Sequence, residues 1–353
     1  MTAARSILSL TNNVQSKTFT KVVFFDVKDW EKEEIHKIVK DFDVKLCTDS
    51  LTIDNASEYA DAEALSIFIN SDCSAKVLEK FKDLQLITTR STGYDHIDLE
   101  YCKSNNIQVA NVPSYGSNTV AEHAMALVLA LTRRIVESAD RVRRNDFRPD
   151  GLTGVDLMGK VMGVVGTGKI GQNLAKYASA FGMKVLAYDV KPNPELAEKF
   201  GFTYVELDYL LAKSDVVSLH VPFLPSTKHL INKKNIMKMK KGSYLINTAR
   251  GGLIETDALF DALRVGHIAG AGLDVFEEEK FLTEEAELLH QDSHGEVDFK
   301  IALENHMMSY LPNVVVTPHN AFNSKEALQR IIVTTVDNIV CFAKGKCENI
   351  IKT

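Results

Sequence analysis

The chain of 353 residues carries a formal net charge of −6 and contains 45% hydrophobic and 25% charged residues. Its length suits two domains better than one core, and its ordinary composition excludes disordered and collagen-like proteins. The mildly acidic balance favours neither nucleic acid nor an anionic membrane as a partner. The longest apolar run, residues 124–131, is too short to span a bilayer.

The cysteines are five in number, widely spaced and without a CxxC pair. This pattern predicts reduced thiols, a cytoplasmic protein and no metal site. Residues 1–21 contain no acidic residue, so import into an organelle is an alternative. Their single arginine and weak amphipathic pattern favour an ordinary tail.

Strand and helix patterns alternate in the first third of the chain. Strands are predicted over residues 22–25, 44–46, 65–69 and 86–89, and helices over 31–39 and 76–81. Such alternation predicts a parallel sheet with right-handed crossovers. This block ends near Pro113.

A long helix follows, because apolar residues recur at helical spacing from Ala121 to Ile135 after a cap at Ser117 or Asn118. A second alternating series then begins. Its predicted strands are residues 161–165, 185–188, 216–219, 244–247, 271–275 and 314–317, and its predicted helices are 169–181, 207–213, 234–239 and 256–265.

The last helix is predicted over residues 325–344 and begins with a capping box of Asn323 and Glu326. We expect it to return to the first block, which otherwise lacks a covering helix. The predicted fold class is α/β with two doubly wound parallel sheets. A Rossmann domain occupies residues 115–316, and a discontinuous, flavodoxin-like substrate domain occupies 1–114 and 317–353. The segment 280–310 is long and polar, and its secondary structure is ambiguous from the sequence.

A glycine-rich turn follows the strand at 161–165 directly, and it consists of Gly166, Thr167, Gly168, Lys169, Ile170 and Gly171. The first glycine permits a tight turn, the second lets a pyrophosphate approach the backbone, and the third lets the next helix pack close to the sheet. The N-terminus of that helix offers N–H groups and a positive dipole end to phosphates. Together these features predict a dinucleotide site.

Asp189 ends the next strand, 23 residues after Gly166. A carboxylate at about this spacing accepts hydrogen bonds from the ribose hydroxyls and repels a 2′-phosphate. NAD is therefore the predicted cofactor, although the nearby Lys191 softens the preference over NADP.

Arg250, Glu279 and His319 each follow a predicted strand of the second sheet, so they share the edge that carries the glycine turn. Arg250 can bind a carboxylate bidentately. His319 can give a proton to a carbonyl oxygen during reduction and take it back during oxidation. Glu279 can orient the imidazole and raise its pKa, and Glu277 and Glu278 are neighbouring alternatives for that carboxylate.

In combination, these motifs resemble the D-isomer-specific 2-hydroxyacid dehydrogenase family and, within it, the D-lactate dehydrogenase branch. The resemblance extends over nearly the whole chain, from residue 22 to residue 350. It is carried by FFDVK at 24–28, RSTGYDHID at 90–98, NVPSY at 111–115, AEH at 121–123, NTARGG at 247–252, GLDVFEEE at 272–279 and TPHNAF at 317–322.

The resemblance implies an NAD-dependent, reversible reduction of a small 2-oxo acid, with pyruvate and D-lactate as the first choice. It implies that the backbone at Thr92 and Gly93 binds the substrate carboxylate beside Arg250, and that Tyr115 and Phe322 line the substrate pocket. It also implies a homodimer built around the helix after Tyr115, with domain closure over the substrate. Dinucleotide contacts are implied for Tyr188, Asp189, His220, Val221, Pro222, Thr248, Ala249 and Asp274.

The sequence departs from the family in two places. Lys280 stands where the family commonly has proline, and the segment 280–310 is longer and more polar than the usual connection. This segment holds His290, His294 and Glu296, whose spacing suits a solvated loop better than a metal site. Alternative substrates are a branched-chain 2-oxo acid, glyoxylate or hydroxypyruvate. An NAD-sensing, corepressor-like scaffold is the alternative from another functional class.

Overall fold

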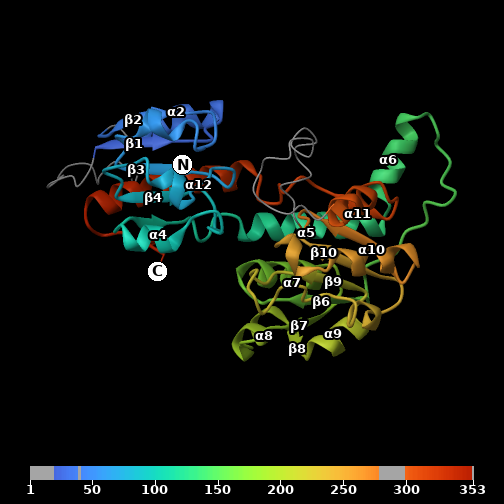
Figure 1. The fold of residues 1–353 in the computed structure, drawn as a ribbon. Helices are drawn as coiled ribbons and strands as arrows, with labels where there is room; N and C mark the ends of the chain where they lie inside the picture. The colour runs from blue at the N-terminus through green and yellow to red at the C-terminus, as the bar shows by residue number, and fades with distance from the viewer. Residues whose placement is uncertain (1–19, 39–40, 278–298, 352–353) are drawn as a thin grey trace. The chain divides into compact units, whose positions relative to one another are not determined.

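The computed structural model describes residues 20–38, 41–277 and 299–351 (Figure 1). The chain divides into two compact units. Unit 1 comprises Met1–Tyr115 and Ser324–Thr353, and unit 2 comprises Gly116–Asn323.

Unit 1 contains a five-stranded parallel sheet in the order β2-β1-β3-β4-β5. This is the 2-1-3-4-5 order of flavodoxin-like sheets. The strands are β1 (Lys21–Phe24), β2 (Asp43–Leu46), β3 (Ala64–Ile67), β4 (Leu86–Thr89) and β5 (Gln108–Ala110). The helices are α2 (Asp29–Ile38), the 3-10 turn η1 (Ala56–Tyr59), α3 (Ala75–Leu78), α4 (Leu99–Ser104) and α12 (Lys325–Ala343).

Both faces of this sheet are buried, which explains its nearly continuous apolar strands. Val22 and Phe24 belong to a core cluster with Ile332 and Ile339 of α12. Val23, one position along the strand, faces the other way and joins the cluster that includes residues of α3 and α4. The C-terminal helix therefore completes the core of the N-terminal unit.

Unit 2 contains a seven-stranded parallel sheet in the order β12-β11-β10-β9-β6-β7-β8. The strands are β6 (Val161–Val165), β7 (Lys184–Tyr188), β8 (Phe202–Tyr204), β9 (Val216–Leu219), β10 (Ser243–Asn247), β11 (Ile268–Leu273) and β12 (Val314–Val316). The strand order reverses between β6 and β9, the place where open α/β sheets bind ligands beyond their carboxyl ends.

Helices cover both faces of the second sheet. Helices α5 (Ser117–Thr132) and α7 (Lys169–Ala180) pack on one face. The opposite face carries α9 (Leu207–Lys213), α10 (Thr256–Arg264) and α11 (Phe299–Ser309). The remaining elements are α6 (Ile135–Arg143), α8 (Pro194–Phe200) and the 3-10 turns η2 (Ile236–Lys238) and η3 (Gly251–Leu253). The predicted fold class of two parallel α/β sheets is confirmed.

The structure corrects several predicted elements. The long helix is not continuous, because Arg134 adopts a left-handed conformation with φ of 48° between α5 and α6. The helix predicted over 234–239 is a single 3-10 turn. The side chain that caps α12 is Ser324, which accepts a hydrogen bond from the N–H of Ala327, rather than Asn323.

Two further differences concern the last quarter of the chain. Part of the ambiguous polar segment forms α11, which packs against α10. The boundary between the units lies after Asn323 rather than at residue 317. The loop after β12 stays with unit 2 because the N–H of His319 donates to the carbonyl of Asp274, on the loop after β11.

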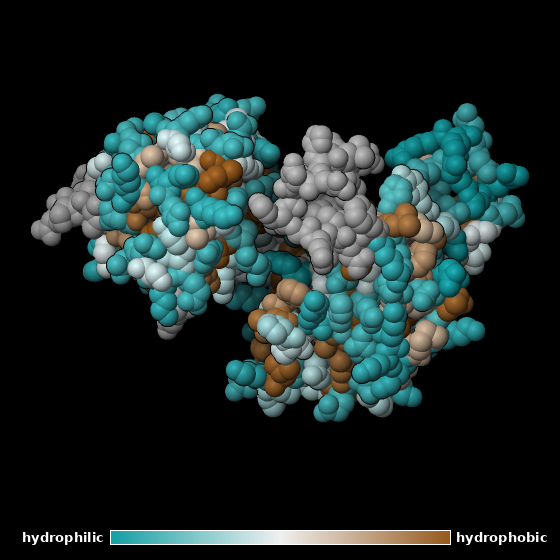
Figure 2. Space-filling model, in the orientation of Figure 1, coloured by the Kyte–Doolittle hydropathy of each residue, from teal (hydrophilic) through white to brown (hydrophobic). Residues whose placement is uncertain are grey.

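No helix in the described parts of the chain has the length and apolar character needed to cross a membrane. Hydrophilic residues cover most of the visible face of each unit (Figure 2). These surfaces agree with the ordinary charge content of the sequence.

Candidate active site

The three glycines of the turn after β6 have different surroundings. Gly166 has a φ of +97°, and a Cβ there would lie 2.7 Å from the carbonyl oxygen of His220. A Cβ at Gly171 would lie 2.0 Å from the carbonyl oxygen of Gly166. A Cβ at Gly168, in contrast, would meet no described atom within 4 Å. The turn is thus closed on two sides and open at its middle glycine.

Helix α7 begins at the open side of this turn. Gly168 occupies its N-cap and contributes no side-chain hydrogen bond, so the first-turn N–H groups can receive an anion. Lys169 is exposed there, whereas Ile170 packs against the core beneath α5 and α7. This arrangement suits a pyrophosphate.

Asp189 lies just past β7, and its carboxylate is tied to the glycine turn. Its Oδ2 accepts hydrogen bonds from the N–H (2.8 Å) and hydroxyl (2.9 Å) of Thr167, and its Oδ1 accepts one from the N–H of Lys191 (3.0 Å). Burial opposes ionisation, but these bonds outweigh it and lower the pKa of Asp189. The carboxylate therefore stays charged beside the turn, as a ribose acceptor requires.

The residues after β9 and β10 form the next part of the same sheet edge. Burial lowers the pKa of His220 to about 4, so its imidazole is neutral at neutral pH. Val221 lies against Gly166, and the carbonyl of Pro222 accepts the hydroxyl of Thr227. The Oγ1 of Thr248 is buried and has no partner among the described residues, so it is available to a ligand. With the open Gly168, these features fit a dinucleotide.

Arg250 follows β10 and occupies the N-cap of η3. Its carbonyl accepts a hydrogen bond from the side-chain amide of Asn247 (2.8 Å), and its Nη1 donates to the carbonyl of Ala249 (2.8 Å). The side chain is half-buried at the edge of the sheet. A planar guanidinium in this setting can bind a carboxylate with two parallel hydrogen bonds.

His319 lies in a turn that is built around Asp274, whose side chain is buried. The Oδ1 of Asp274 accepts the hydroxyl of Thr317 (2.5 Å) and the N–H of Asn320 (3.0 Å), and its Oδ2 accepts the N–H of Ala321 (2.9 Å). His319 itself is left-handed, with a φ of 49°. Asp274 thus fixes an unusual backbone conformation that presents the imidazole.

His123 of α5 extends this arrangement. Its Nε2 lies 3.0 Å from the hydroxyl of Thr317 and 3.6 Å from Oδ1 of Asp274. Because Thr317 donates its proton to Asp274, His123 is the donor to Thr317. The sequence motifs contained His123 and Asp274 but did not indicate that these residues support the His319 turn. Their partners are too distant in sequence for a local pattern to join them.

Glu279 and Glu278 lie outside the described residues. Glu277 is described, and its carboxylate contacts His229 at 2.6 Å and Thr256 at 2.8 Å. Both of its oxygens already have partners, which makes Glu277 a weaker alternative to Glu279 for the predicted carboxylate partner of His319. The residues His290, His294 and Glu296 also lie outside the described parts, in which no cluster of potential metal ligands occurs.

The other predicted substrate residues lie in separate units. In unit 1, the carbonyl of Thr92 accepts the side-chain amide of Asn111, and the carbonyl of Gly93 accepts the hydroxyl of Ser91. The carbonyl of Tyr115 accepts Nε of Arg330. Phe322 is half-buried in unit 2, three residues after His319.

Comparison with known proteins identifies this set of motifs. Residues 125–321 match the family model described as D-isomer specific 2-hydroxyacid dehydrogenase, NAD binding domain. The chain belongs to this family. The matched residues lie in unit 2, which carries the glycine turn, and the family makes the chain an NAD-dependent oxidoreductase.

The similarity to other 2-hydroxyacid dehydrogenases extends over both units. A 2-hydroxyacid dehydrogenase homolog from Zymomonas mobilis is 39% identical, covering 92% of this chain and 98% of its own. The D-lactate dehydrogenase of Escherichia coli is 35% identical, covering 93% and 99%. The crystal structure of a D-lactate dehydrogenase from Aquifex aeolicus, complexed with NAD and lactic acid, is 38% identical with a TM-score of 0.83, covering 94% and 99%.

Proposed function

We propose that this dehydrogenase reduces pyruvate to D-lactate with NADH, and that the reaction is reversible. The observation that carries the proposal is the common edge of the second sheet. The glycine turn follows β6, Arg250 follows β10 and His319 follows β12, all at carboxyl ends of parallel strands. The similarity to proteins described as D-lactate dehydrogenases supports the choice of substrate.

The proposed roles follow from the chemistry of each side chain. NADH supplies the hydride when bound. Arg250 would hold the substrate carboxylate, and His319 would protonate the carbonyl oxygen as the alcohol forms. Glu279 would accept a hydrogen bond from the imidazole and favour its protonated form. Thr92 and Gly93 would offer backbone N–H groups to the substrate carboxylate, and Tyr115 and Phe322 would shape the pocket.

His319→Ala tests the proton-transfer role. We expect NADH to bind with unchanged affinity in a fluorescence titration, while turnover falls by about 10²–10⁴-fold, the usual contribution of general acid–base catalysis. Near-normal turnover in this variant would overturn the role of His319.

A panel of 2-oxo acids tests the substrate. We expect pyruvate to give a higher kcat/KM than glyoxylate, hydroxypyruvate or a branched-chain acid, and chiral chromatography of the product to give D-lactate. A different preferred acid would correct the substrate. Tight NADH binding without turnover of any acid would favour the corepressor-like scaffold.

We also propose that the enzyme is a homodimer built around α5 and α6. The support is a set of exposed apolar residues on α6, where Ile135, Val136 and Val142 are 55%, 47% and 45% exposed. Light scattering after size-exclusion chromatography would give twice the chain mass of 39.2 kDa. A cytoplasmic location stays a proposal that fluorescence microscopy of a tagged chain can test.

A further inference from the structure

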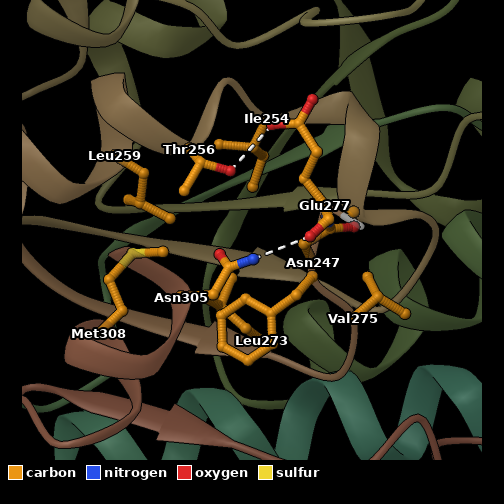
Figure 3. A pocket seen from close by; sticks show the side chains of 11 residues that line it. Asn247, Ile254, Thr256, Leu259, Leu273, Val275, Glu277, Asn305 and Met308 are labelled. Carbon is orange, nitrogen blue, oxygen red and sulfur yellow. Dashed lines mark hydrogen bonds between the residues drawn. The ribbon is translucent and has the colours of Figure 1, made fainter. Parts of the chain in front are cut away.

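The segment that follows β11 is held by residues from three other places in unit 2. The carboxylate of Glu277 is 12% exposed and contacts Nε2 of His229 at 2.6 Å. Its other oxygen accepts the hydroxyl of Thr256, at the start of α10, at 2.8 Å. Its backbone carbonyl accepts the side-chain amide of Asn305, from α11, at 2.8 Å. Figure 3 shows Thr256 and Asn305 pointing toward Glu277.

We call this group of contacts the Glu277 clamp. It packs directly against the arginine turn, which consists of residues 250–252. Gly251 follows Arg250, and a Cβ at Gly251 would lie 1.9 Å from the carbonyl carbon of Phe276 and 2.3 Å from the N–H nitrogen of Glu277. The two backbones are thus in contact without an intervening side chain. Residues 276–277 therefore form part of the packing surface of the turn that carries Arg250.

His229 contacts the arginine turn from a second side. Its N–H donates to the carbonyl of Gly252 at 2.8 Å, while its imidazole contacts Glu277. His229 adopts a left-handed conformation with a φ of 51°, which is uncommon outside glycine. The carbonyl of His229 accepts the side-chain amide of Asn232 at 2.8 Å, so this conformation is supported.

The chemistry of Glu277 sets the direction of the hydrogen bonds in the clamp. An ionised carboxylate only accepts hydrogen bonds, so both His229 and Thr256 must donate to it. Hydrogen bonds to an ionised group are shorter and about twice as strong as neutral ones. Because each oxygen already has a partner within unit 2, we expect the effect of Glu277 on the reaction to be indirect.

We propose that Glu277, with His229 and Thr256, is a positioning residue that holds the guanidinium of Arg250 where it binds the substrate carboxylate. This inference rests on the proposed role of Arg250 in substrate binding. It assigns the affinity for the 2-oxo acid partly to residues that do not touch it. The described hydrogen bonds of the Glu277 side chain and carbonyl do not reach the glycine turn, so we expect NADH binding to change less than substrate binding.

The experiment is a double-mutant cycle between Glu277→Ala and Arg250→Ala, with pyruvate as substrate. We expect Glu277→Ala to raise KM for pyruvate by about 10- to 100-fold, the size of effect produced by displacement of a binding group by up to 1 Å. The Kd for NADH should stay within about twofold, as for an independent site. In the Arg250→Ala background, Glu277→Ala should add no further rise in KM.

Matched variants separate positioning from general damage to the fold. Thr256→Val removes one donor to Glu277 and should raise KM. Thr256→Ser keeps the hydroxyl, so its KM should stay near the parent value. These variants also keep the inference testable if Glu277→Ala does not fold. Glu255→Ala is the control, because Glu255 lies next to Thr256 and contacts Lys233 instead. It should leave KM near the parent value.

The outcomes distinguish this inference from the proposed function. If Arg250→Ala raises KM and the Glu277 and Thr256 variants do not, the positioning role is overturned and substrate binding by Arg250 stands. Equal rises in KM from Glu277→Ala in both Arg250 backgrounds would also overturn it, because the effect would not pass through Arg250. An unchanged KM in Arg250→Ala would overturn both the inference and the role of Arg250.

Discussion

Replacement of Asp274 should destabilise unit 2 far more than replacement of an exposed aspartate. Asp274→Ala leaves the hydroxyl of Thr317 and the N–H groups of Asn320 and Ala321 without their acceptor. Hydrogen bonds to charged groups contribute about 1.5–3 kcal/mol each but are not additive within one network. We therefore expect a loss of about 3–5 kcal/mol, the cost of removing one member of a buried charged network.

The milder change Asp274→Asn should fall between the parent and Asp274→Ala. If the amide oxygen takes the Oδ1 position, Thr317 and Asn320 keep their acceptor, but the amide NH₂ then faces the N–H of Ala321. One unpaired buried donor costs about 1–3 kcal/mol. The order parent, Asn, Ala is therefore expected for the free energy of unfolding.

Urea unfolding followed by two signals can assign this loss to unit 2. Far-UV circular dichroism reports both units, whereas Trp30, the single tryptophan, lies in α2 of unit 1. Asp208→Ala is the control, because Asp208 is 63% exposed and pairs only with Lys238 among its described ion-pair partners, an interaction worth at most about 1 kcal/mol. A midpoint for Asp274→Ala no lower than that of the control would refute the reasoning.

Four other substitutions test three separate parts of the structure. Gly171→Ala should cost about 1–3 kcal/mol of stability through overpacking. Gly168→Ala should unfold like the parent, since its Cβ meets no described atom within 4 Å. It should nevertheless bind NADH more weakly in a fluorescence titration. Arg90→Met should lower the stability of unit 1 by about 3–5 kcal/mol, because it leaves the buried carboxylate of Glu31 without its charged partner. The carbonyls of Phe25 and Asp26 also lose the guanidinium as a donor. Tryptophan fluorescence can follow this loss, and a change below that of a surface arginine variant would contradict it. Burial and, to a smaller extent, the hydrogen bond with Asp257 raise the pKa of Glu304 from 4.5 to about 7. Between these two values the folded state holds a proton that the unfolded chain releases. The free energy of unfolding should therefore fall as the pH rises through this range. Glu304→Gln should remove that fall when urea midpoints at pH 5 and pH 8 are compared, and an equal fall in both proteins would argue against the assignment.

The sheet strands were predictable because they are buried on both faces and contain short apolar runs. The helix break at Arg134 was not, because the apolar spacing continues through Ile135 and only the backbone conformation interrupts it. Short elements such as α4 and β8 also escaped prediction, since three to six residues carry too little periodicity.

The backbone geometry of the glycine turn was predictable, because here one residue type performs a backbone function in a fixed context. Gly166 and Gly171 are required by contacts that any side chain would violate. The contacts that support the His319 turn and the arginine turn were not predictable, because they join residues far apart in sequence. His123 and Thr317 are 194 residues apart, and His229 and Glu277 are 48 apart, so no local pattern joins them.

The return of α12 to the first sheet also affects when each unit can fold during synthesis. Domains usually fold from the N-terminus as the chain leaves the ribosome. Here the core of unit 1 includes Ile332, Val336 and Ile339, which are made only after the whole of unit 2. The nucleotide-binding unit can therefore be complete while the N-terminal sheet still exposes one apolar face. Synthesis of unit 1 therefore begins first, but its core is completed last. Until α12 is made, chaperones can bind the exposed apolar face of its sheet.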